Sequence, residues 1–276
     1  MGDYWCYTFW KDGYDSDLIL GLVGHLSFDT FEEEGEKLKA YIPSEDCDDI
    51  FQDSLNIILD EYQISKNKTF IPNQNWNETW ENQFSPIFIE NQIAISSGEE
   101  SYSSYPFHIL INPNMTFGTG HHQTTHLMLK TMLYINWEGT SVLDFGCGTG
   151  ILGIYAAMRK ADKILALDID ERSLANTKEN FELNKISSKY EVKNEKLESL
   201  EDNTFDAILA NINTNTLLEN SSNFNRLLKW NGRLLLSGFL ISDEKKITEH
   251  FQKSGFQVKN QSTSDDWMCM LLVKDQ

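Results

Sequence analysis

The chain has 276 residues, of which 40% are hydrophobic and 24% charged, and its formal net charge is −19 at pH 7. Its length allows one large domain, or a medium domain with a small one. No apolar run approaches the ~20 residues that span a bilayer, and the acidic start lacks a basic signal segment, so we expect neither a membrane protein nor a secreted one. The cysteines form no C-x-x-C pair, which favours a reducing cytoplasm over a disulfide framework or a cysteine zinc site.

Negative charge is concentrated near the amino end. Residues 1–62 contain sixteen Asp and Glu against three Lys, which leaves −13 of the net charge in this part of the chain. Such a surface repels nucleic-acid phosphates and attracts basic partners, so we expect no direct binding to nucleic acid. The alternative interpretation is a generally acidic soluble protein in which no single charge has a specific role.

Residues 1–65 are predicted to form a small α+β domain. Aromatic residues over 4–10 predict a strand, and the capped apolar pattern over 15–28 predicts a helix. Two strands turning near Gly35 follow, and 46–62 has the pattern of an amphipathic helix with acidic residues in its first turn. The resulting βαββα order indicates a ferredoxin-like half-sandwich.

A linker is predicted over residues 66–100, which are rich in Asn, Gln and Trp and end in a polar loop. From 101 to 276 strands and helices alternate, which is typical of a doubly wound, largely parallel α/β sheet covered on both faces. The last two strands follow each other without a helix, so we expect a terminal antiparallel hairpin. The predicted strands after residue 113 span 141–145, 163–169, 190–194, 205–211, 233–239, 256–262 and 267–274.

A glycine-rich loop directly follows the strand at 141–145. Gly146, Gly148 and Gly150 lie between this strand and a helix predicted to begin near Ile151. Glycine lets backbone amides approach a ligand closely, and a helix N-terminus favours electronegative groups. Residues 148–153 also fit the dinucleotide pattern G-x-G-x-x-G, so a nicotinamide cofactor is one alternative.

Two acidic residues bear on the choice of cofactor. Asp144 stands two residues before the first glycine, where a carboxylate can reach an amino group of S-adenosylmethionine but would repel a pyrophosphate. Asp168 ends the next strand about twenty residues further on, where an acid binds the ribose hydroxyls of either cofactor. Asp144 therefore favours S-adenosylmethionine over NAD, whereas Asp168 indicates an adenosine ligand without choosing between the two cofactors.

The stretch "MTFGTGHHQTTHLML" at 115–129 places three histidines and four threonines around two glycines. His122 and His126 have the i, i+4 spacing of a zinc helix, but Gln123 replaces the required glutamate and no third ligand is evident, so we expect no metal. A helix predicted over 124–135 puts the preceding block at the ligand-binding edge of the sheet. A cofactor wall or substrate gate is therefore favoured over a simple helix cap.

Five segments carry a family resemblance. "NPNMTFGTGHHQTT", "VLDFGCGTGILG", "ALDID", "ILANI" and "LLLSGF" occur in this order and resemble the PrmA-type methyltransferases, which modify protein eleven of the large ribosomal subunit. The segment "NWNETWENQFSPI" is also similar to that family. The resemblance covers roughly residues 75–270, and its F-G-T-G-x-H-x-T-T block is far more specific than the glycine loop.

The resemblance implies transfer of methyl groups from S-adenosylmethionine to lysine ε-amines and the N-terminal α-amine of that basic ribosomal protein, which a small ferredoxin-like N-terminal domain grips. Family cofactor contacts correspond to Thr125, Gly146, Asp168 and Asn211. In related amine methyltransferases an asparagine at the position of Asn211 faces the reacting nitrogen, which implies a catalytic role. The alternative is an asparagine that only bonds a neighbouring loop.

The residues themselves extend this site. Asp144, Gly148 and Thr119 are added to the predicted cofactor contacts, and Phe117 is predicted as an apolar wall at the reacting end. A lysine must lose its proton before it attacks, and burial beside an apolar wall lowers its pKa. No dedicated base is evident; His122 is one candidate, although a structural role is favoured for it.

Departures from the family pattern leave other functions open. The segments "NPN", "HHQTT" and "NTNTLLEN" differ from the family pattern. None of these differences removes a residue assigned to the cofactor, so they bear on the identity of the substrate and not on methyl transfer. The alternatives are methylation of another protein or a small molecule, an NAD-binding oxidoreductase, and a binding module without turnover.

Overall fold

The computed structural model describes residues 3–13, 16–24, 26–34, 37–71, 84–98, 102–112 and 116–275. The chain divides into one unit of residues 1–76 and a second of residues 77–276. None of the helices in the described ranges has the length and apolar character needed to cross a membrane.

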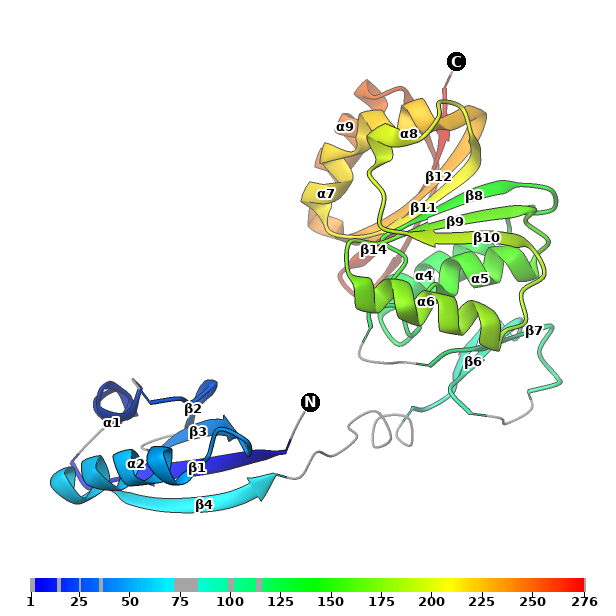
Figure 1. The fold of residues 1–276 in the computed structure, drawn as a ribbon. Coiled ribbons are helices and arrows are strands. Elements are labelled where there is room, and N and C mark those ends of the chain that lie inside the picture. The colour runs from blue at the N-terminus through cyan, green and yellow to red at the C-terminus, as the bar shows by residue number, and fades with distance from the viewer. Residues whose placement is uncertain are drawn as a thin grey trace. The chain divides into compact units, whose positions relative to one another are not determined.

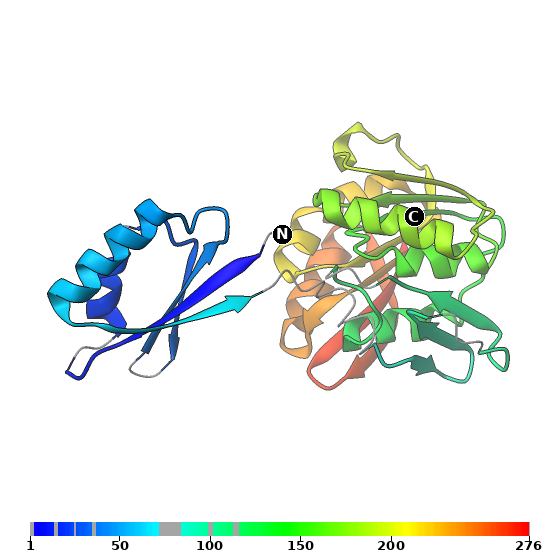
Figure 2. The ribbon, with the colours of Figure 1, turned by 60° about the horizontal axis from the view of Figure 1, so that its bottom comes forward.

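The first unit has the β-α-β-β-α-β order of the ferredoxin-like fold (Figure 1). Its four strands form an antiparallel sheet in the order β2-β3-β1-β4, and both helices lie on the same face of that sheet (Figure 2). The elements are β1 Tyr4–Trp10, α1 Ser16–Val23, β2 Thr30–Glu34, β3 Lys37–Pro43, α2 Asp49–Tyr62 and β4 Ser65–Ile71.

Alternation along the strands builds the core of this unit. Tyr7 and Phe9 of β1 point toward the helices and are buried with alternate residues of β3. From α2, Phe51 and Leu55 enter the same core one helical turn apart. The α2 helix begins where Asp48 accepts a hydrogen bond from the Phe51 backbone N–H at 2.8 Å, as its acidic start predicts.

The prediction of a linker over residues 66–100 is wrong at its amino end, where strand β4 forms. Residues 66–71 pair antiparallel with β1 and so complete the sheet instead of leaving it. The polar sequence SKNKTFI conceals the strand because β4 is an edge strand with mostly exposed side chains. The linker prediction for 72–83 falls outside the described residues.

The other end of the predicted linker also forms strands. β5 (Ile87–Ile89) and β6 (Ile93–Ser96) form an antiparallel hairpin, and β6 pairs in parallel with β7 (Phe107–Leu110). Their isoleucines pack into the core of the second unit, so this segment belongs to it.

The second unit contains a seven-stranded sheet in the order β10-β9-β8-β11-β12-β14-β13. β10, β9, β8, β11 and β12 run parallel, whereas β14 is antiparallel to β12 and to β13, which confirms the doubly wound sheet with its terminal hairpin. The strands are β8 Ser141–Phe145, β9 Lys163–Leu167, β10 Lys189–Lys193, β11 Phe205–Asn211, β12 Leu228–Leu240, β13 Phe256–Ser264 and β14 Trp267–Lys274.

Helices cover both faces of this sheet. α4, α5 and α6 lie on one face, and α7, α8 and α9 lie on the other (Figure 1), over two separate apolar cores. The helices are α4 Gln123–Met132, α5 Ile151–Met158, α6 Glu171–Leu183, α7 Thr214–Glu219, α8 Ser221–Leu227 and α9 Glu244–Lys253, with short 3-10 turns at Leu197–Ser199 and Ile241–Asp243.

The strand order reverses between β8 and β11. From β8 the chain proceeds to β9 and β10 on one side, whereas β11 and β12 lie on the other side. The loops that follow β8 and β11 therefore diverge at this point and leave a crevice at the carboxyl ends of the strands, where open α/β sheets bind ligands.

Asn176 and Asn180 of α6 and its C-cap Asn184 hold the segment that leads into the F-G-T-G block. Asn176 donates to the Asn112 carbonyl at 3.0 Å. Asn184 exchanges two hydrogen bonds with the backbone of Leu110, at 2.9 and 2.7 Å. Asn180 accepts the Asn112 N–H at 2.8 Å and donates to the Thr149 carbonyl at 2.9 Å. α6 thereby connects β7 to the glycine loop through side-chain amides.

Replacing Asn180 with Ala should destabilise the second unit. The side chain is fully buried, and its loss leaves the Asn112 N–H and the Thr149 carbonyl without these partners. We expect the free energy of unfolding to fall by roughly 2–4 kcal/mol in urea titrations. The matched control on the exposed side of α6, Glu182→Ala, should change it by about 0.5 kcal/mol or less. Equal effects of the two variants would contradict this role.

Candidate functional site

A cavity of about 350 Å³ lies at the carboxyl ends of the parallel strands. This volume is in the range of small-molecule sites, about 300–1,000 Å³. Its wall is formed by the ends of β8, β9 and β11 and the loops after them. The lining residues are Phe117, Phe145, Gly146, Gly148, Leu167, Asp168, Ile169, Ser173, Glu195, Asn211, Ile212, Asn213 and Thr216.

The glycine loop is fixed by backbone contacts that exclude side chains. The N–H groups of Gly146 and Cys147 both donate to the Leu167 carbonyl, at 2.8 and 3.0 Å. Gly148 has a φ of +55°, and a Cβ there would lie 2.3 Å from the Phe117 carbonyl oxygen. Glycine is required at 148 both for this backbone angle and for the close approach.

The F-G-T-G block lies directly on that loop. Thr149 donates its backbone N–H to the Phe117 carbonyl at 3.0 Å and its hydroxyl to the Gly118 carbonyl at 2.7 Å. The Phe117 ring remains 55% exposed and lines the cavity. Two motifs thirty residues apart in sequence therefore form one wall.

Asp168 presents a fixed carboxylate to the cavity. One oxygen accepts the Gly148 N–H at 3.0 Å and the other accepts the Asp170 N–H at 3.0 Å. Each carboxylate oxygen can accept a second hydrogen bond. The side chain is thus oriented in advance and retains acceptor capacity for a pair of hydroxyls.

Asp144 does not line the cavity. It is 1% exposed, and its Oδ2 accepts the Gly153 N–H of α5 at 2.9 Å. Burial raises the pKa of Asp144 to about 7, and the nearby Asp168 carboxylate adds to this rise. The structure places this carboxyl beneath the glycine loop, because the first turn of α5 offers a backbone donor there.

Asn211 ends β11 and has one unpaired buried atom. Its Nδ2 donates to the Thr125 hydroxyl at 3.3 Å, so Thr125, which is fully buried and does not line the cavity, orients the amide from behind. The Oδ1 of Asn211 is buried without a hydrogen-bond partner. Among the described residues, the only other buried side-chain atoms without a partner are Ser44 Oγ and Asn112 Oδ1. An unpaired buried acceptor costs about 1–3 kcal/mol, so a ligand N–H at this point would be stabilised.

The histidines of the block have structural contacts. His122 is the N-cap of α4, where its Nδ1 accepts the Thr124 N–H at 3.3 Å. Thr119 bonds the His121 ring at 3.2 Å and does not line the cavity. In the described ranges, no three His, Cys, Asp or Glu side chains are grouped as a metal ion would require.

Known proteins are similar to this chain in sequence. The PrmA family model, described as ribosomal protein L11 methyltransferase, matches residues 25–275. A ribosomal protein L11 methyltransferase of Porphyromonas gingivalis is 36% identical over 267 residues, which cover 94% of this chain and 91% of that protein. Another, of Bacteroides thetaiotaomicron, is 34% identical over 256 residues, or 91% of each chain. This chain belongs to the ribosomal protein L11 methyltransferase family.

A solved structure agrees with this membership. The crystal structure of the ribosomal protein L11 methylase from Lactobacillus delbrueckii subsp. bulgaricus is 26% identical and has a TM-score of 0.63, covering 70% of this chain and 100% of that one. The predicted family and its methyltransferase fold are thereby confirmed.

Several lining residues of this family member were not predicted from its sequence. Glu195 follows β10 by two residues, and Asn213 caps α7 by accepting the Thr216 N–H at 3.0 Å. Neither belongs to a motif. Their positions just past the carboxyl ends of β10 and β11 are the one sequence signal that could have identified them.

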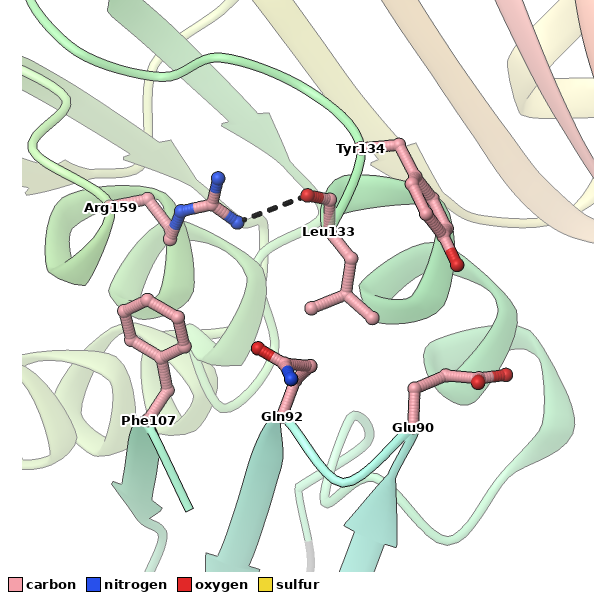
Figure 3. Close-up of a pocket in the computed structure, with 6 residues that line it drawn as sticks. All are labelled: Glu90, Gln92, Phe107, Leu133, Tyr134 and Arg159. Carbon is pink, nitrogen blue, oxygen red and sulfur yellow. Dashed lines mark hydrogen bonds between the residues drawn. The ribbon is translucent and has the colours of Figure 1, made fainter.

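A larger pocket of about 510 Å³ lies apart from this cavity and is lined by Glu90, Gln92, Phe107, Leu133, Tyr134 and Arg159 (Figure 3). Among its lining residues, Arg159 donates to the Leu133 and Ile135 carbonyls at 3.2 and 3.4 Å and to the Tyr155 hydroxyl at 2.8 Å. These contacts tie α5 to the end of α4. The smaller cavity is therefore the candidate functional site, since it alone of the two joins the glycine loop, Asp168 and Asn211.

The buried carboxyl of Asp144 predicts a specific pH dependence of stability. Its folded-state pKa of about 7 lies above the ordinary value of 3.8, so the folded state binds this proton more tightly. The contribution to stability is present at low pH and is lost as pH rises from about 4 to about 7, by up to roughly 4 kcal/mol. We expect Asp144→Asn, which retains an acceptor for Gly153, to gain stability relative to the unsubstituted chain over this interval.

Urea unfolding at intervals between pH 4 and pH 8 measures this difference. Other carboxylates titrate in both proteins, so their effects cancel in the comparison. Parallel stability curves for the two proteins would show that Asp144 is ionised without penalty in the folded state.

Proposed function

We propose that this chain transfers methyl groups from S-adenosylmethionine to ribosomal protein L11, at lysine ε-amines and the N-terminal α-amine. Family membership and the names of its relatives support the substrate. The observation that carries the chemistry is one cavity wall that combines the fixed Asp168 carboxylate with the unpaired Oδ1 of Asn211.

The residues of the cavity suit the cofactor. Asp168 would bind the ribose hydroxyls, since both of its oxygens are held in place and retain lone pairs. Gly146 and Gly148 would let the loop backbone approach the ligand closely. When bound, the cofactor supplies an electrophilic methyl group on a sulfonium sulfur.

The remaining predicted contacts act from outside the cavity wall. Thr125 would orient Asn211 through their hydrogen bond, and Asp144 would support the loop through Gly153 at the start of α5. Thr119 also lies outside the lining, and we propose that it contacts the bound cofactor from the F-G-T-G block, two residues after Phe117.

Asn211 would act on the acceptor amine. Its unpaired Oδ1 can accept a hydrogen bond from a neutral amine, which directs the nitrogen lone pair into the cavity. The neighbouring Phe117 and Ile212 side chains reduce hydration, and burial lowers a lysine pKa from its usual ~10.4. The proton leaves to water, so this scheme needs no dedicated base.

The first unit would dock the basic ribosomal protein. Ile50, Asp53, Ile57 and Asp60 of α2 are all exposed and share one helical face, with Ile50 77% and Ile57 67% exposed. An acidic face with two exposed apolar side chains suits a basic protein that also buries apolar surface. We further propose a cytoplasmic location and no direct binding to nucleic acid.

Intact-mass spectrometry of ribosomal protein L11 tests the proposal. With this chain and S-adenosylmethionine we expect mass gains in ~14 Da steps. Asn211→Ala should slow these gains by about 100-fold or more, because the oriented acceptor is lost. Asn223→Ala, which removes a surface contact to Glu198, should leave the rate unchanged. An unmodified substrate in the presence of the unsubstituted chain would disprove the proposed function.

A further inference from the structure

A second pocket adjoins the cofactor cavity on the β12 side. It has a volume of about 390 Å³ and shares Asn213 with that cavity. Its lining residues are Asn213, Thr214, Asn215, Gly238, Phe239, Leu240, Asp243, Lys246 and Trp267.

The backbone segment 211–213 lies at the border of the two pockets. Asn211 pairs in register with Ser237 of β12, and the Ile212 N–H donates to the Ser237 carbonyl at 3.1 Å. At Gly238 a Cβ would lie 2.4 Å from the Ile212 carbonyl oxygen, so the two strand ends are in direct contact. The two pockets therefore adjoin along the segment 211–213, and Asn213 lines both.

Aromatic rings also connect the two pockets. Phe117 lines the cofactor cavity, and its ring centroid lies 5.3 Å from that of His122. The His122 ring in turn lies 4.8 Å from the ring of Trp267, which lines the second pocket. This row of three rings runs from one pocket to the other, beside the backbone segment 211–213.

We propose that the second pocket receives the lysine-bearing segment of the substrate protein, with Trp267 packed against the lysine side chain; this rests on the proposed function. Methyl transfer requires donor and acceptor to meet in line, so the acceptor space must adjoin the cofactor cavity near Asn211. An indole face attracts an ammonium group, and quaternary ammonium ligands are recognised by aromatic rings.

The charges around this pocket fit a cationic segment. Asp243 lines it and accepts the Thr214 hydroxyl at 2.7 Å, while Asp265 and Asp266 directly precede Trp267 in the β13–β14 turn. Lys246 is the one cation in the lining. Of these carboxylates Asp243 alone lines the pocket, where Lys246 matches its charge. Asp265 and Asp266 lie next to Trp267 in sequence, and their negative charge favours a lysine-containing peptide over an acidic one.

Steady-state kinetics with ribosomal protein L11 as variable substrate test this assignment. Trp267→Ala should raise the KM for ribosomal protein L11 at least tenfold and leave the KM for S-adenosylmethionine within twofold. Trp267→Phe should recover most of this loss, and Asp243→Asn should raise the same KM and weaken its salt dependence. The matched control is Trp230→Ala, which removes a 63% exposed indole outside both pockets and should behave as the unsubstituted chain.

Calorimetric binding of ribosomal protein L11, measured in parallel, separates this inference from the proposed function. If the unsubstituted chain binds the protein without methylating it, weaker binding by Trp267→Ala supports the pocket while the proposed function fails. Binding and KM values for Trp267→Ala that equal those of Trp230→Ala would overturn the assignment. It is also overturned if the KM for S-adenosylmethionine rises equally with a lowered melting temperature, because Trp267 is then only structural.

Discussion

The close approach of backbone segments at the point where the strand order reverses determines the rest of this site. Gly146, Gly148 and Gly238 each have positive φ, and a Cβ on any of them would lie within 2.5 Å of an atom of Ile212 or Phe117. These contacts bring the ends of β8, β11 and β12 together with the F-G-T-G block. Side chains larger than hydrogen would push these segments apart and open the cavity.

Not every polar side-chain atom of this site has a hydrogen-bond partner. Both oxygens of Asp168 have backbone partners, whereas Asn211 bonds Thr125 through its Nδ2 and leaves its Oδ1 without one. A fold that keeps a buried acceptor unpaired gives up stability there, and a ligand N–H restores it. This difference in hydrogen bonding suits the roles proposed for the two residues, in which Asp168 binds the cofactor and Asn211 faces the amine.

Local sequence patterns predicted those parts of the fold that depend on local chemistry. The glycine loop, the helix at Ile151 and the strand from Lys163 follow from short-range spacing and are present, although this strand ends at Leu167 and not at the predicted residue 169. The polar β4 escaped prediction because its pairing with β1 is non-local. Asp144 shows the limit of reasoning from a motif. It stands near the end of the strand before the glycine loop, as its spacing predicts, but its carboxyl accepts the Gly153 N–H of α5. Glu195 belongs to no motif, and it lines the cavity because the order of strands in the sheet places the carboxyl end of β10 there, which short-range spacing alone does not reveal.

Titration calorimetry of the full chain with S-adenosylmethionine and, separately, with NAD tests most directly the claim that this cavity is a methyl-donor site. We expect S-adenosylmethionine to bind and NAD not to bind. Asp168→Asn should weaken S-adenosylmethionine binding at least tenfold, about 1.4 kcal/mol. Asp162→Asn, at the exposed opposite end of β9, should have no effect. Binding of NAD that is lost in Asp168→Asn, with no binding of S-adenosylmethionine, would contradict the account.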